Sequence, residues 1–263
     1  MKKIFVLMLL AAIAFTGCKK DKVDKLDEKI IGKWMIAEMN GSLVGTNKKQ
    51  VFTFISSSKA YVSTSIVAKP GMPSLWMDHL ETEIAMGDDK VTLTSHPNES
   101  TKILDEITIT AINDKEFTAN RKLTMYKDGE VSFTNDMPIR FVKVTVDYSQ
   151  SIIGMWEGHV TSAMGSEFDD GEEHRWEYLA DGNFHFYRLV NGEWQLSNDE
   201  FSNYFVDGSL LCTRWKNNGE NTEEKREWWE IASIENGVMN WTALRQREDG
   251  TTYTATFSMT KVR

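Results

Sequence analysis

Ile30-Ile31-Gly32-Lys33-Trp34 and Ile152-Ile153-Gly154-Met155-Trp156 are two nearly identical stretches of this chain, 122 residues apart. A second pair of segments, Ile109–Asn113 and Ile231–Glu235, repeats at the same offset. Self-similarity at one fixed offset, close to the length of a domain, is typical of an internal duplication. The sequence therefore predicts two tandem domains rather than one large one.

The first residues form a targeting segment. Lys2 and Lys3 precede an unbroken apolar run, Ile4–Phe15, that is too short for a transmembrane helix. The following Phe15-Thr16-Gly17-Cys18 resembles a bacterial lipobox. This resemblance implies cleavage before Cys18, a diacylglycerol on its sulfur and an acyl chain on its new amine, which together anchor a protein stably. An ordinary secretory signal followed by a chance cysteine is the alternative.

The position after Cys18 is Lys19 rather than the Asp that retains lipoproteins in the inner membrane, which favours an outer-membrane address. The side of that membrane, periplasmic or surface-facing, stays open. The predicted organisation is then a signal peptide, a lipidated cysteine with a charged tether, and two domains, at residues 1–17, 18–29, 30–147 and 148–263.

The composition is that of a globular protein, with 41% hydrophobic and 26% charged residues. The formal net charge of −9 argues against a nucleic-acid partner, which requires a basic surface. The chain has two cysteines, Cys18 and Cys212, so lipidation of the first leaves the second without a partner. Cys212 lies in the expected strand Leu210–Trp215 and is expected to be a small buried residue.

Strand signals fill both repeats. Tyr253, Ala255, Phe257 and Met259 alternate with threonine and serine, as in a strand covered on one face. Short polar turns separate these runs, among them Asp128-Gly129, Asp181-Gly182, Asn191-Gly192, Asp207-Gly208, Asn236-Gly237 and Asp249-Gly250. Asn-Gly and Asp-Gly between alternating runs are strong hairpin signals. Successive hairpins favour an up-and-down barrel, in which the sheet closes on itself.

The Gly-x-Trp at the start of each first strand resembles the first motif of the lipocalin/calycin superfamily. The resemblance implies an all-β fold of two tandem antiparallel up-and-down β-barrels of lipocalin-like type. It also implies a structural role for four residues, with each Trp closing one barrel end: Gly32, Trp34, Gly154 and Trp156. A basic residue of the last strand is then expected to pack on each ring, from the pairs Arg140 or Lys143 and Lys261 or Arg263.

Aromatic residues gather in the second repeat, which holds seven of the nine tryptophans. Several alternate along expected strands and could line an apolar pocket. The candidate ligand-binding residues are Trp176, Tyr178, Phe184, Phe186, Tyr253 and Phe257. The alternative is that these rings simply fill the core of the barrel.

No catalytic or metal site is predicted. His159, His174 and His185 lack the close spacing of a metal motif, and no nucleophile elbow or phosphate-binding glycine loop occurs. We therefore expect neither enzymatic activity nor a cofactor. The irregular segment Ala68–Asp78 carries several apolar residues and is expected to pack on the second domain or to cover the first barrel as a lid.

Two functions follow. The first is an outer-membrane lipoprotein that binds a small apolar or amphipathic ligand inside a lipocalin-like barrel. The alternative is a non-catalytic structural or interaction module of a cell-envelope complex, with both barrels filled and a protein partner on the surface. Fold alone does not choose between them.

Overall fold

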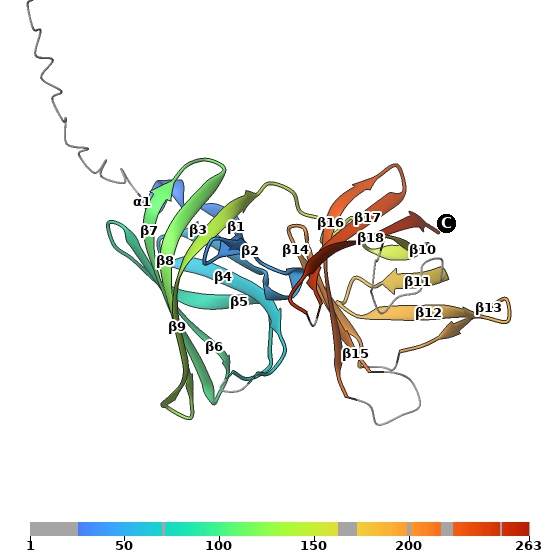
Figure 1. The fold of residues 1–263 in the computed structure, drawn as a ribbon, viewed down its shortest axis with the longest axis horizontal. Helices are drawn as coiled ribbons and strands as arrows, with labels where there is room; N and C mark the ends of the chain where they lie inside the picture. The colour runs from blue at the N-terminus through green and yellow to red at the C-terminus, as the bar shows by residue number, and fades with distance from the viewer. Residues whose placement is uncertain are drawn as a thin grey trace, which may run out of the picture.

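The computed structural model describes residues 26–69, 72–162, 173–198, 201–216, 223–247 and 249–262. The predicted signal peptide, Cys18, most of the tether and Arg263 lie outside these residues. The described chain is built almost wholly of strands, folded into two lobes that lie side by side (Figure 1). No described helix has the length and apolar character needed to cross a membrane.

The first lobe is a closed antiparallel barrel. Its strands follow one another in chain order, and β1 also pairs with β9, so that the eight strands β1 and β3–β9 form a ring with β2 added beside β1. The elements are Leu26–Lys29 (α1), Gly32–Met39 (β1), Ser42–Leu43 (β2), Thr46–Lys48 (η1), Gln50–Ser56 (β3), Lys59–Ile66 (β4), Leu75–Met86 (β5), Lys90–Asn98 (β6), Thr101–Ile112 (β7), Glu116–Lys127 (β8) and Glu130–Val144 (β9).

The second lobe is a curled antiparallel sheet in the order β13-β12-β11-β10-β18-β17-β16-β15-β14. Its strands are Gly154–Ser162 (β10), Glu173–Tyr178 (β11), Phe184–Val190 (β12), Glu193–Leu196 (β13), Asn203–Asp207 (β14), Leu210–Trp215 (β15), Lys225–Glu235 (β16), Val238–Gln246 (β17) and Thr252–Lys261 (β18). The predicted all-β, up-and-down architecture is confirmed. At Asp128-Gly129, Asn191-Gly192 and Asn236-Gly237 both residues have positive φ, as two-residue hairpins prefer.

The second sheet differs from the first in how its edges meet. Among the described residues, one isolated bridge joins Asn183 to Asn203 across the gap. The side chain of Asn198 takes the place of further ladder bonds, because it accepts from Phe186 N at 2.8 Å and donates to Phe184 O at 2.9 Å. A side-chain amide thus satisfies backbone groups of β12 that a closed barrel would pair with a strand.

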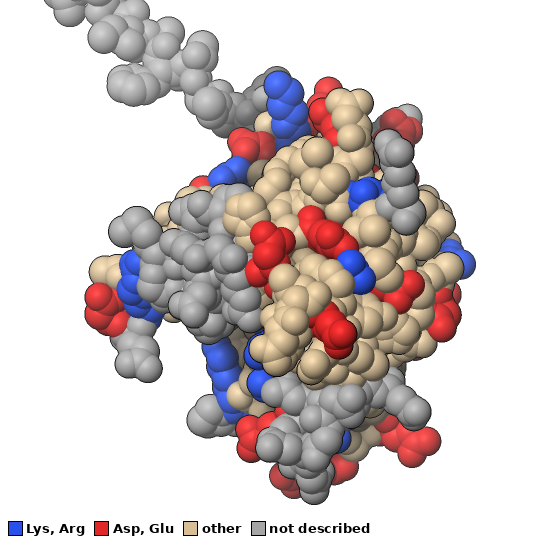
Figure 2. All heavy atoms as spheres, turned by 90° about the vertical axis from the view of Figure 1, so that its right-hand side faces the viewer, with Lys and Arg blue, Asp and Glu red and all other residues tan. Residues whose placement is uncertain are grey.

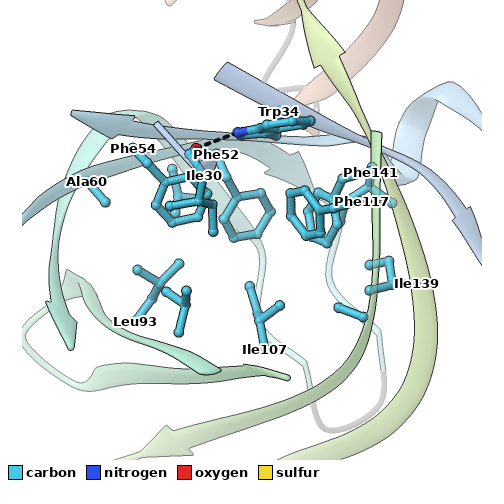
Figure 3. Packing of buried hydrophobic residues seen from close by; sticks show 14 of the residues in the cluster. Ile30, Trp34, Phe52, Phe54, Ala60, Leu93, Ile107, Phe117, Ile139 and Phe141 are labelled. Carbon is cyan, nitrogen blue, oxygen red and sulfur yellow. Dashed lines mark hydrogen bonds between the residues drawn. The ribbon is translucent and has the colours of Figure 1, made fainter. Parts of the chain in front are cut away.

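The repeated Gly-x-Trp stretch forms the same structure in both lobes. Trp34 is fully buried, and its Nε1 donates to Ile30 O at 2.6 Å (Figure 3). Lys143 Nζ lies 5.1 Å from the centre of that ring. In the second lobe Trp156 donates to Ile152 O at 2.7 Å, and Lys261 Nζ lies 5.1 Å from its ring. Arg140 instead forms ion pairs with Glu38 and Glu116.

The glycine of the motif is required by its backbone and by the lysine. Gly32 has φ +124° and Gly154 has φ +127°, a region that L side chains rarely adopt. A Cβ at Gly154 would also lie 2.9 Å from the side chain of Lys261. The glycine therefore leaves room for the lysine stem to reach the tryptophan ring.

The two lobes share a packed interface. Met35 and Val51 of the first barrel form an apolar cluster with Phe205, Leu210 and Cys212 of the second lobe. Cys212 is fully buried there, and burial raises the pKa of its thiol. The small buried cysteine predicted from the sequence therefore belongs to the contact between lobes. A cluster that crosses the boundary limits the motion of one lobe against the other.

An ion-pair network lies beside this cluster. Asp207 is 1% exposed and forms an ion pair with Lys33 Nζ at 2.5 Å. Lys33 Nζ also forms an ion pair with Asp147 at 2.8 Å. Burial alone would lower the pKa of Lys33, but its hydrogen bonds to the two carboxylates more than offset this and raise it. His79 Nε2 lies 3.6 Å from Asp207, and the pKa of His79 is raised by its hydrogen bond to Asp78 and by Asp207.

His79→Asn should remove a pH-dependent part of the stability. Since the folded-state pKa of His79 is raised, its contribution is fully present below the unfolded value of about 6.5 and is lost as pH rises through the folded value. Asparagine tolerates the φ of +46° at this position. Urea midpoints between pH 5 and pH 9 should show the largest loss at the acid end. His96→Asn is the control for removing one exposed imidazole, and an equal loss at all pH values would contradict the prediction.

Candidate functional site

A cavity of about 500 Å³ opens inside the first barrel. Four buried phenylalanines of this lobe gather near Trp34, where Phe117 stacks on Phe141 and Phe52 meets Phe141 edge to face (Figure 3). The cavity is lined mostly by aliphatic and methionine side chains, among them Leu93, Ile103, Leu123 and Met125, together with the rings of Phe133 and Trp228. Protein interiors rarely leave voids much larger than a water molecule. An open space of this size in a barrel therefore marks a candidate binding site.

One buried polar cluster faces the cavity. Arg121 is 3% exposed, and its Nε and Nη2 bond both oxygens of Asp105, with an Nη2–Oδ2 distance of 2.5 Å. Nη2 also donates to Gln50 Oε1 at 2.9 Å, and the guanidinium lies over the ring of Phe52. The charges of Arg121 and Asp105 therefore balance inside the barrel, as buried ion pairs must.

The hydrogen bonds of Arg121 leave one nitrogen free. Nη1 makes none with any residue in the described part of the chain, although the residue lines the cavity. Two N–H groups are thus available to a water or to a neutral oxygen of a ligand.

Sequence reasoning missed Arg121 and Asp105, although a signal was present. Period-two alternation places Asp105 on the same strand face as Ile103 and Ile107, and Arg121 on the face of Phe117 and Leu123. A charged residue on an otherwise apolar strand face points into a core or a cavity, where it needs a partner.

The second lobe contributes to the cavity wall. Trp228 of β16 lines the cavity, and its Nε1 donates to Ser65 O at 2.8 Å. Arg226, two residues earlier, donates Nη1 to Ile66 O at 2.9 Å and to Leu75 O at 2.5 Å. These bonds tie β16 to the ends of β4 and β5, so the mouth of the first barrel is built by both lobes.

The segment Ala68–Asp78 takes part in both roles considered for it. Met72 lines the cavity and packs against the first core, so that it partly covers the barrel. Trp76 instead meets Phe205 of the second lobe edge to face at 4.9 Å, with Arg214 4.5 Å from its ring. Pro70 and Gly71 lie outside the described residues.

The structure brings the predicted aromatic residues of the second lobe together in its core. Five of them are at most 5% exposed and pack on one another and on Trp229 and Trp241: Trp176, Tyr178, Phe184, Phe186 and Phe257. Burial raises the pKa of Tyr178 well above its usual value. Tyr253 is half-buried, packs against the same core, and its ring lies 4.4 Å from the guanidinium of Arg247. Ligand contact by these rings stays a prediction.

The three histidines considered as metal ligands have different surroundings. His174 is buried against Phe186, and desolvation together with Arg188 lowers its pKa to about 4. His159 and His185 are each paired with a glutamate, Glu173 and Glu177. In the described ranges, no three histidine, cysteine or acidic residues are grouped to hold a metal ion.

No protein-family model matches this sequence, and no curated protein matches it either. Among solved structures, the chain is similar to two mutant forms of transferrin-binding protein B, a vaccine antigen of Haemophilus parasuis. The first is 11% identical, with a TM-score of 0.26, over 88% of this chain and 45% of that one. The second is 8% identical, with a TM-score of 0.25, over 85% of this chain and 62% of that one. This chain thus spans less than two thirds of either structure, and such low TM-scores establish no shared fold.

Arg121→Met should destabilise the first barrel by about 3–5 kcal/mol, because it leaves the Asp105 carboxylate buried and unpaired. The double variant Arg121→Met/Asp105→Leu should recover most of that loss, since no charge then remains in the barrel. Urea unfolding of both variants and of Asp105→Leu alone completes the cycle. Additive losses would show that the two side chains do not act as a pair.

Proposed function

We propose that this chain is a lipid-anchored envelope protein that binds a small apolar or amphipathic ligand inside its first barrel, without catalysing a reaction. The observation that carries the proposal is the open cavity of about 500 Å³ lined mainly by apolar side chains. Its volume falls within the range of about 300–1,000 Å³ that is usual for small-molecule sites.

The shape of the barrel supports a ligand rather than a filled core. Eight strands give an interior that side chains can fill or that can hold one small ligand. In this barrel four buried phenylalanines lie near Trp34, whereas the cavity wall includes the aliphatic side chains of Leu93, Ile103 and Leu123. A barrel that needed only stability would gain from larger side chains at these positions.

The surface also favours binding of a small molecule over binding of nucleic acid. Figure 2 shows that acidic and basic side chains are interspersed on the face of the second lobe, with large areas of neither charge. The formal net charge of −9 would repel a polyanion.

Leu123→Trp should block the site. Leu123 lines the cavity and is half-buried, so the larger ring can enter empty space without displacing packed neighbours. Binding of the apolar fluorescent probe N-phenyl-1-naphthylamine should weaken by about tenfold or more, while the urea midpoint stays close to that of the wild type.

Leu196→Trp provides the matched control, because Leu196 is exposed on β13 of the second lobe. Probe binding that survives Leu123→Trp but is lost in a folded Phe257→Ala variant would move the site to the second lobe. No probe binding to the wild type would favour the interaction module with filled barrels.

The anchor is tested separately. Because the lipobox resemblance assigns lipidation to Cys18, Cys18→Ala should yield an unacylated protein that leaves the membrane fraction in a carbonate wash. Mass spectrometry of the N-terminal peptide should show the acyl chains in the wild type alone. A variant that still fractionates with membranes would contradict the lipobox interpretation.

A further inference from the structure

A groove of about 660 Å³ runs between the two lobes. The first barrel supplies the segment from Met39 to Lys48, and the second supplies Trp228, Arg245 and Tyr253. Its base is fixed by a bond across the boundary, in which Leu244 N donates to Thr46 Oγ1 at 2.8 Å. Lys49 adds an ion pair to Glu230 at 2.8 Å. The groove is therefore formed by direct bonds between the two lobes.

The groove continues into the barrel cavity. Met39, Lys48, Lys69, Asn135 and Trp228 line both spaces. A molecule longer than the barrel interior can thus pass from the apolar cavity through this shared mouth and extend between the lobes. The two spaces form one site with an apolar part and a polar part.

The charges of the groove favour an anion. Its lining includes Lys48, Lys69 and Arg245 and no described aspartate or glutamate, although the whole chain carries a formal net charge of −9. Arg245 is paired with Glu227 at 2.6 Å. Lys48 and Lys69 are exposed, and neither forms an ion pair with a described residue. Two uncompensated ammonium groups at the mouth attract an oxyacid.

The interior of the barrel favours the apolar end of such a molecule over its charged end. Arg121 and Asp105 already neutralise each other, so an anion beside them would leave one unbalanced charge in an apolar space. An alkyl chain among Leu93, Ile103 and Met125 carries no such cost. The orientation with the chain inside and the charge at the mouth is therefore the favourable one.

We propose that the ligand is a single-chain amphiphile with a phosphate or carboxylate head, whose chain fills the first barrel and whose head lies in the groove between the lobes on Lys48 and Lys69. This rests on the proposed function, since it requires that the barrel accept an apolar chain. The second lobe then acts as part of the site, because Trp228 and Arg245 form its far wall.

The test is displacement of N-phenyl-1-naphthylamine by dodecyl phosphate, dodecanoate and dodecanol, the two anions below their critical micelle concentrations and the alcohol below its solubility limit. At low salt the two anions should displace the probe at concentrations about tenfold lower than the alcohol. Lys48→Gln/Lys69→Gln should abolish that advantage and leave displacement by dodecanol unchanged. High salt should narrow the difference in the wild type.

Lys115→Gln/Lys127→Gln is the matched control, because both lysines are exposed on the first lobe and outside the groove and cavity. It should keep the full advantage of the anions. Equal displacement by anion and alcohol in the wild type, or an advantage that survives Lys48→Gln/Lys69→Gln, would overturn the inference while leaving the cavity site standing. If neither the probe nor any amphiphile binds, the proposed function fails with it.

Discussion

The hydrogen bonds that Arg226 and Trp228 donate to backbone carbonyls of the first barrel hold the candidate site together. Their acceptors are Ser65, Ile66 and Leu75, at the point where β4 and β5 separate. Because the acceptors are backbone atoms, these bonds link β16 directly to the strands at the barrel mouth. The position of Trp228 in the cavity wall, and with it the shape of the groove, follows from these bonds.

The same contact explains why the interface holds buried charge. Asp207 is almost fully buried and depends on Lys33 of the other lobe for its partner. Separation of the lobes would expose the apolar cluster around Phe205 and would break that ion pair. Gly208, next to Asp207, makes the approach possible, because a Cβ there would lie 2.3 Å from Val144. A tight, charged and apolar boundary of this kind favours a fixed arrangement over a hinge.

Much of the fold was accessible from the sequence, since its signals are local. Two-residue turns such as Asn236-Gly237, period-two alternation and the repeated Gly-x-Trp each act within a few residues. The groove could not be predicted from the sequence, because it brings Lys48 and Lys69 together with Arg245. Lys48 and Arg245 are nearly 200 positions apart in the chain. The cluster of Arg121 and Asp105 was predictable only in part. Alternation could have marked both residues as inward-facing, whereas their pairing required the register of β7 and β8.

The uneven distribution of tryptophan between the two repeats corresponds to a difference between the interiors of the two lobes. Large rings supply apolar surface, which is why they suggested a pocket in the second lobe, but they also occupy volume. There Trp176, Trp229 and Trp241 pack on one another. The first barrel has longer strands, up to the 15 residues of β9, and smaller inward side chains, which leaves space. Trp34 and Trp156 are buried in the same way in the two lobes, so the difference between the two interiors comes from the other inward side chains. The second lobe, with its packed aromatic core, supplies Trp228 to the wall of the cavity in the first lobe.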